Sequence, residues 1–128
     1  MIDKFGRVMI YVNDPKAVAD FWTDKMGFII GRVTTNETGV LSVELTPNDI
    51  SDAGIVLFDR DVVQKMEPEL NLGTPSILFS SYNIKDMRDK LIEKGVNVGD
   101  IIEMNGALTF NFSDPEGNYF AVEQIEKG

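Results

Sequence analysis

The feature that most constrains the fold of this 128-residue chain is a repeat in the order of its predicted elements. Each half contains an apolar strand, then an amphipathic helix, then three further strands. Gly27 and Gly95 close the two helices 68 residues apart, and Pro47 and Pro115 have the same separation. Neither half alone is large enough to bury both faces of a sheet. The repeat therefore predicts two matching halves in one compact domain, with helices on one side and a concave, open face on the other.

A turn signal near the end of the chain marks the last hairpin of the second half. Pro115 fixes φ at about −65° and Gly117 tolerates positive φ, so Asp-Pro-Glu-Gly-Asn is typical of a tight reversal. Residues 107–112 and 119–125 flank this turn and are rich in aromatic and β-branched side chains, which favours strands. The turn therefore predicts an antiparallel pair.

The repeat divides the chain into a first module over residues 1–58, a linker over residues 59–74 and a second module over residues 75–128. Strands are predicted in the first module over residues 5–12, 28–34, 40–46 and 54–58. Those of the second module cover residues 76–80, 96–104, 107–112 and 119–125. The linker has one short helical turn around residues 62–66. The predicted fold class is α+β, with two βαβββ modules forming a cupped mixed sheet and helices on its outer face.

Both predicted helices begin at a capping residue. Asn13 or Asp14 caps the first helix, and Asn83 caps the second. Each helix has an apolar stripe at helical spacing: Val18, Phe21, Trp22 and Met26 in the first, and Ile84, Met87, Leu91 and Ile92 in the second. Alternation in the first strand separates Val8, Ile10 and Val12 from Arg7, Met9 and Tyr11. The second of these two sets predicts a functional face.

Histidine and cysteine are both absent from the sequence. The chain therefore has no disulfide and no thiolate nucleophile, and it lacks the side chain that most often serves as a general base near neutral pH. A metal site would need oxygen ligands, which favour magnesium or calcium. The net charge of −9 disfavours nucleic acid and anionic membranes as partners and suits a cationic or neutral ligand, although it also simply favours solubility.

The sequence shows no signal for a membrane or for secretion. No apolar run approaches the roughly 18–20 residues that span a bilayer. Residues 1–4 lack the basic and apolar regions of a signal peptide. We therefore expect a cytoplasmic protein.

Several motifs resemble the vicinal oxygen chelate superfamily, which includes glyoxalase I, bleomycin resistance proteins and extradiol dioxygenases. The motifs are Tyr11-Val12-Asn13-Asp14-Pro15, Phe21-Trp22, Met26-Gly27-Phe28 and Phe112-Ser113-Asp114-Pro115-Glu116-Gly117-Asn118. Their order and the repeat extend the resemblance over essentially the whole chain. The resemblance implies paired βαβββ modules around a cupped sheet, assembled as a homodimer.

The resemblance also implies four positions at which the metal enzymes of the superfamily bind a divalent ion. In this sequence they fall on Arg7, Leu57, Ser76 and Ala121. A guanidinium is a fixed cation, and Leu and Ala have no donor atom. Shifting each position by one residue recovers no ligand. We therefore expect no metal and no cofactor, and metal-dependent glyoxalase or dioxygenase activity is not inherited.

The favoured hypothesis is a metal-free small-molecule binding protein of the bleomycin resistance type, which sequesters a cationic or planar, antibiotic-like ligand. A soft Met and flat aromatic rings would contact such a ligand, and a few polar groups would orient it. Either face of the 107–112 strand could line the site. The predicted ligand-binding residues are Arg7, Met9, Tyr11, Glu44, Leu57, Ser76, Leu78, Phe110, Tyr119, Ala121 and Glu123.

Two other functions fit the same residues. In the first, a metal-independent lyase or isomerase uses Glu44 or Glu123 as a carboxylate base, with Arg7 as the partner of a developing oxyanion. In the second, a regulatory or interaction module fills the cup with its own side chains. A purely structural role for Arg7 is an ion pair with Glu44 or Glu123.

Overall fold

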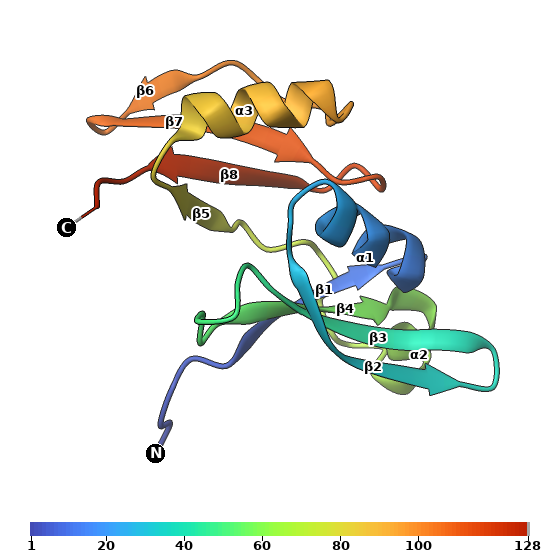
Figure 1. The fold of residues 1–128 in the computed structure, drawn as a ribbon. Helices are drawn as coiled ribbons and strands as arrows, with labels where there is room; N and C mark the ends of the chain where they lie inside the picture. Colours follow the sequence, from blue (N-terminus) through green and yellow to red (C-terminus); the bar gives the residue numbers. More distant parts are fainter. Residues whose placement is uncertain (128) are drawn as a thin grey trace. The chain divides into compact units, whose positions relative to one another are not determined.

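The computed structural model describes residues 1–127 as two compact units, one spanning Met1–Thr74 and the other starting at Pro75. Each unit is a four-stranded mixed sheet with the element order β-α-β-β-β (Figure 1). The predicted α+β class and the two βαβββ modules are thereby confirmed. Within residues 1–127, every helix is too short or too polar to cross a membrane.

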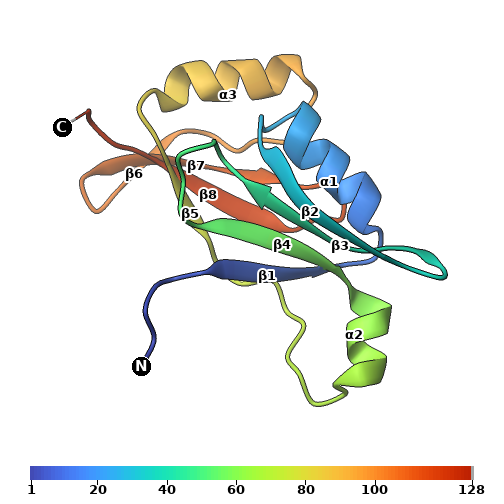
Figure 2. The same ribbon diagram turned by 60° about the horizontal axis from the view of Figure 1, so that its bottom comes forward.

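The first unit contains four strands and two helices. They are β1 (Arg7–Val12), α1 (Pro15–Asp24), β2 (Ile29–Asn36), β3 (Gly39–Thr46), β4 (Gly54–Asp59) and α2 (Arg60–Met66). The strand order is β1-β4-β3-β2, with β1 parallel to β4 and the other pairs antiparallel. Helix α1 packs on one face of this sheet, and α2 follows the end of β4 (Figure 2).

The core of the first unit lies between α1 and its sheet. Ile10, Leu57 and Val43 stand side by side on three neighbouring strands and are almost completely buried. Val18 and Trp22 of α1 are also fully buried. Asp14 caps the helix, because its side chain accepts a 3.1 Å hydrogen bond from the Ala17 amide. The predicted helical stripe and the alternation of β1 therefore place this core correctly.

The second unit repeats the arrangement with β5 (Leu78–Ser81), α3 (Ile84–Glu93), β6 (Ile102–Met104), β7 (Ala107–Ser113) and β8 (Tyr119–Gln124). Its strand order is β5-β8-β7-β6, with β5 parallel to β8. Helix α3 contacts β7 and β8 on one face of the sheet (Figure 1). Its residues Ile84 and Leu91 are buried against the core face of the sheet. On this face the ring centroids of Phe112 and Phe120 lie 5.6 Å apart.

The Asp-Pro-Glu-Gly-Asn segment forms the predicted reversal between β7 and β8. The buried Asp114 carboxylate accepts hydrogen bonds of 2.9 Å from the amides of Glu116 and Asn118 and of 2.8 Å from the Asn118 side chain. Gly117 has a φ of 80°, a conformation that costs a glycine little. One carboxylate thus closes the turn.

The strand predicted over residues 96–104 is much shorter than expected, since β6 covers only Ile102–Met104. Before it, Val98 makes an isolated bridge with Phe112. The Gly99 carbonyl accepts a 2.7 Å hydrogen bond from Nε of Arg88 on α3. This contact takes the Gly99 carbonyl away from strand pairing, and regular pairing resumes at Ile102.

Candidate functional site

A cavity of about 450 Å³ lies within the second unit, on the face of the sheet opposite α3. Its lining comes from β5, β6, β7, β8, the segment that leads into β6 and the turn between β6 and β7. The lining residues are Leu78, Gly99, Asp100, Ile102, Met104, Asn105, Ala107, Thr109, Phe110, Asn111, Ala121 and Glu123. The volume is within the range of small-molecule sites in proteins.

Strand register explains which side chains face this cavity. Thr109 pairs with Glu123, and Asn111 pairs with Ala121, which in turn pairs with Leu78. Because side chains alternate along a strand, Phe110 projects to the opposite face, where it pairs with Val122 and is almost completely buried. The face of β7 that lines the cavity therefore carries Thr109 and Asn111.

Apolar side chains around the cavity are unusually exposed. Leu78, Ile102 and Met104 come from two different strands, and each leaves about half of its surface accessible. Large apolar groups that gather around one hollow are typical of a ligand site, whereas scattered ones have no such meaning. These three side chains can therefore contact the apolar part of a ligand.

Two carboxylates line the same cavity, and only one of them has a cationic partner. Nη2 of Arg88 lies 3.5 Å from Oδ1 of Asp100, which is almost fully exposed. The Glu123 side chain is half-buried on β8 and makes no hydrogen bond or ion pair within residues 1–127. No Lys or Arg of the described chain lines this cavity. Glu123 is therefore an uncompensated carboxylate in a largely apolar hollow.

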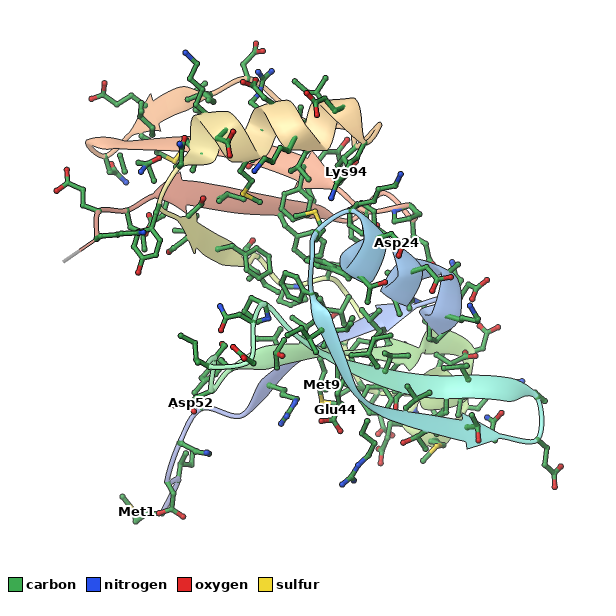
Figure 3. All side chains as sticks on the ribbon, in the orientation of Figure 1. Met1, Met9, Asp24, Glu44, Asp52 and Lys94 are labelled. Atoms are coloured by element: carbon green, nitrogen blue, oxygen red, sulfur yellow. The ribbon has the colours of Figure 1, made fainter. Side chains whose placement is uncertain are left out.

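The first sheet carries an ion-pair cluster of two guanidinium groups and one carboxylate on the face away from α1. Nε of Arg7 lies 3.2 Å from Glu44, and Nε of Arg32 lies 3.9 Å from the same carboxylate. Met9 and Glu44 project from this face (Figure 3). The predicted ion pair between Arg7 and Glu44 is thus present, and the guanidinium of Arg7 is engaged in it.

The predicted site residues fall into separate groups in the structure. Leu78, Ala121 and Glu123 line the cavity of the second unit together. Arg7, Met9 and Glu44 occupy the open face of the first sheet. Ser76 is exposed and precedes β5, and Tyr119 is exposed at the start of β8, opposite Ser113. Neither of these two residues lines the cavity.

The prediction for Leu57 needs correction, and two other predicted residues, Phe110 and Tyr11, have buried side chains. Leu57 is not on the open face: it is fully buried beside Ile10 and Val43 under α1, and Val56 takes the open-face position opposite Met9. Phe110 is among the residues that line the cavity, although its ring is almost completely buried and projects to the opposite face of β7. Tyr11 is buried, and its ring lies 6.4 Å from that of Phe58.

The cavity residues of β6, and Thr109 and Asn111 of β7, were not among the predicted ligand-binding residues. Thr109 and Asn111 were detectable, because they alternate with Leu108, Phe110 and Phe112. Ile102 and Met104 had no such signal, since their place in the cavity depends on the short edge pairing with Thr109 and Ala107. The alternation of side chains along a strand can be seen in the sequence, but the number of residues that pair with the neighbouring strand cannot.

The side chains at the superfamily's four metal positions do not suit a divalent ion. Arg7 is positively charged and paired with Glu44. The second position, Leu57, faces the core, and neither of its neighbours on the open face, Val56 and Phe58, has a donor atom. The fourth position is Ala121, which has none either. Only Ser76, a weak hydroxyl ligand, remains. Residues 1–127 contain no group of three acidic side chains arranged to hold a metal ion.

Comparison with known proteins places the chain in a family. The model of the glyoxalase/bleomycin resistance protein/dioxygenase superfamily matches residues 4–122. The uncharacterized protein YetH of Bacillus subtilis (strain 168) is 26% identical over 125 residues, which are 97% of this chain and 100% of YetH.

Solved structures share the fold at lower identity. TnmS3, an antibiotic binding protein from Streptomyces sp. CB03234, has a TM-score of 0.79 at 22% identity and matches over 98% of both chains. A superfamily member from Sphaerobacter thermophilus DSM 20745 has a TM-score of 0.79 at 21% identity, covering 97% of this chain and 98% of the other. With the family match over residues 4–122, the chain belongs to the glyoxalase/bleomycin resistance protein/dioxygenase superfamily.

Proposed function

We propose that this protein is a metal-free binding protein that sequesters an amine-bearing, planar small molecule in the cavity of its second unit. The observation that carries this proposal is the uncompensated Glu123 carboxylate, which shares the cavity with half-exposed Leu78, Ile102 and Met104. A cation with an apolar body would match both features at once.

The physical argument starts from the environment of Glu123. A half-buried carboxylate loses part of its hydration, and without a partner this loss is not offset. An ammonium or protonated ring nitrogen of a ligand would supply the missing charge-assisted hydrogen bond. The apolar side chains would cover the rings of the ligand, with Met104 adapting to their outline.

Two further observations support the choice of ligand. The chain has a net charge of −9, which raises the local concentration of cations around it. TnmS3, whose fold this chain shares, is an antibiotic binding protein. An antibiotic-like cation is therefore the ligand class that we propose for this chain as well.

Proflavine, a planar cation, tests the proposal against acridone, an uncharged tricycle of similar outline. We expect a fluorescence titration to show saturable binding of proflavine and much weaker binding of acridone. Glu123→Gln should weaken proflavine binding about tenfold or more, since a hydrogen bond to a charged group contributes about 1.5–3 kcal/mol. Equal affinity for the two compounds would contradict the proposal.

Glu103→Gln is the matched control for this substitution. Glu103 lies on β6 opposite Leu108, outside the cavity lining, and is exposed. Its replacement removes the same charge from the same unit. Proflavine affinity should therefore stay at the wild-type value. A loss of affinity equal to that of Glu123→Gln would mean that the net charge of the protein, and not the position of Glu123, determines proflavine binding.

A further inference from the structure

A second hollow lies in the first unit, between α2 and the segment that follows it. Its volume is about 490 Å³. Its lining includes Arg60, Gln64, Leu70, Asn71, Leu72 and Gly73. No acidic residue of the described chain lines this hollow, although the sequence has 21 acidic and 12 basic side chains. The only charge in the lining is therefore positive, although Asp59, Asp61, Glu67 and Glu69 flank the lining residues in the sequence.

Arg60 is the only source of this positive charge among the described residues that line the hollow. Its Nη2 donates a 2.8 Å hydrogen bond to the Tyr11 carbonyl. Its Nε is buried and has no acceptor within residues 1–127, and no described carboxylate lies within ion-pairing distance of its guanidinium. The buried Nε is out of reach of a ligand, but Nη1 also has no acceptor in the described chain and is not buried. Nη1 can therefore donate to an anion from outside the chain.

Two amide side chains add hydrogen-bond donors to the same hollow. The Asn71 carbonyl oxygen accepts a 2.8 Å hydrogen bond from the Gly73 amide, which leaves the Asn71 NH₂ group without an acceptor in the described chain. The Gln64 side chain makes no hydrogen bond within residues 1–127. Both groups can donate to an oxyanion.

We propose that this hollow binds a small organic monocarboxylate with a short apolar body. The carboxylate would accept from Arg60 and from the Asn71 and Gln64 amides, and Leu70 and Leu72 would cover the hydrocarbon part. A single cation matches one negative charge better than the two charges of a phosphate. The ligand differs in charge from the one proposed for the second unit, so the two proposals are independent.

Hexanoate is the probe for this site, and hexanamide is its uncharged control. Titrations followed by ¹H–¹⁵N NMR report on the side-chain amides of Gln64 and Asn71 and on the Gly73 amide. We expect all three signals to shift together and to saturate with hexanoate, and to stay in place with hexanamide. Absence of saturation at millimolar hexanoate would overturn the proposed site. The role of Arg60 would then be limited to its hydrogen bond with the Tyr11 carbonyl.

Two variants test whether hexanoate binds at this hollow. Arg60→Gln should weaken hexanoate binding by about tenfold or more, because it removes the charged donor. Gln64→Glu keeps the Arg60 contact with Tyr11 but places an anion one helical turn from Arg60, and it should abolish binding even if Arg60→Gln fails to fold.

Lys65→Gln is the control, since Lys65 is exposed on α2 and lies outside the hollow. It lowers the net charge by one unit, as each of the two test variants does. Wild-type affinity in Lys65→Gln supports the site. A loss in Lys65→Gln that equals the loss in Gln64→Glu would overturn it.

Discussion

Nε of Arg7 lies 3.2 Å from the carboxylate of Glu44, across the intervening strand β4. On that strand Gly54 stands opposite Arg7 and has no side chain to obstruct the contact. The ion pair neutralises Glu44, one of the two carboxylates that the sequence offers as a ligand partner. It leaves Glu123 as the carboxylate with unused binding capacity.

The Arg7–Glu44 pair should contribute little to stability. Both side chains retain solvent access, 42% for Arg7 and 25% for Glu44. A double-mutant cycle with Arg7→Gln and Glu44→Gln, followed by urea unfolding, should give a coupling free energy of about 0.2–1 kcal/mol. A coupling of several kcal/mol would mean that the pair is far less solvated than its exposure indicates.

Gly54→Ala should destabilise the first unit by about 1–3 kcal/mol. A Cβ at this position would lie 2.4 Å from the Leu45 carbonyl oxygen and 2.9 Å from Cγ2 of Thr46, so the backbone would have to move. Gly31→Ala on the edge strand β2 is the control, because its nearest contact would be an ordinary 3.6 Å. Equal free energies of unfolding for the two variants would refute the steric argument.

Asp114→Asn should lower the free energy of unfolding by about 2–4 kcal/mol. The carboxylate now accepts three hydrogen bonds from Glu116 and Asn118, two at Oδ1 and one at Oδ2. The substitution keeps the size of the side chain but replaces one of these oxygens by an NH₂ group, which cannot accept, and it removes the negative charge from the other. Asp100→Asn, at an exposed position of the same unit, should change stability by less than about 0.5 kcal/mol. Thermal unfolding of both variants measures the difference. An Asp114→Asn variant as stable as the wild type would contradict the view that the Asp114 carboxylate holds the turn closed.

Leu57→Ala distinguishes a core residue from a ligand-facing one. Full burial under α1 predicts a loss of about 2–5 kcal/mol in the free energy of unfolding. Met9→Ala, on the open face and 45% exposed, should cost less than about 1 kcal/mol. If chemical denaturation instead shows a larger loss for Met9→Ala, the register of β1 and β4 is wrong.

The sequence predicted the fold well because its signals are local. Caps at Asp14 and Asn83 and the turn at Asp114 each depend on neighbouring residues, and the structure shows all three. The repeat then supplied the order of the helices and strands along the chain. Local chemistry thus explains why the α+β class and the two modules follow from the sequence alone.

The candidate site was harder to predict, because a shift of one residue turns a strand over. Residues 55–58 are continuously apolar, so nothing in that run shows that Leu57 faces the core and Val56 the open face. In β7, by contrast, the polar residues Thr109 and Asn111 alternate with apolar ones, and this alternation indicates which face of the strand lines the cavity. The cavity itself depends on pairing between distant strands.

Intermolecular NOEs between proflavine and methyl groups of the protein test the central claim most directly. The account predicts NOEs to the methyls of Met104, Ala107 and Ala121, which line the cavity with Glu123, and weaker NOEs at the same proflavine concentration in Glu123→Gln. NOEs confined to the methyl of Met9 in the first unit, or cavity NOEs that persist unchanged in Glu123→Gln, would contradict it.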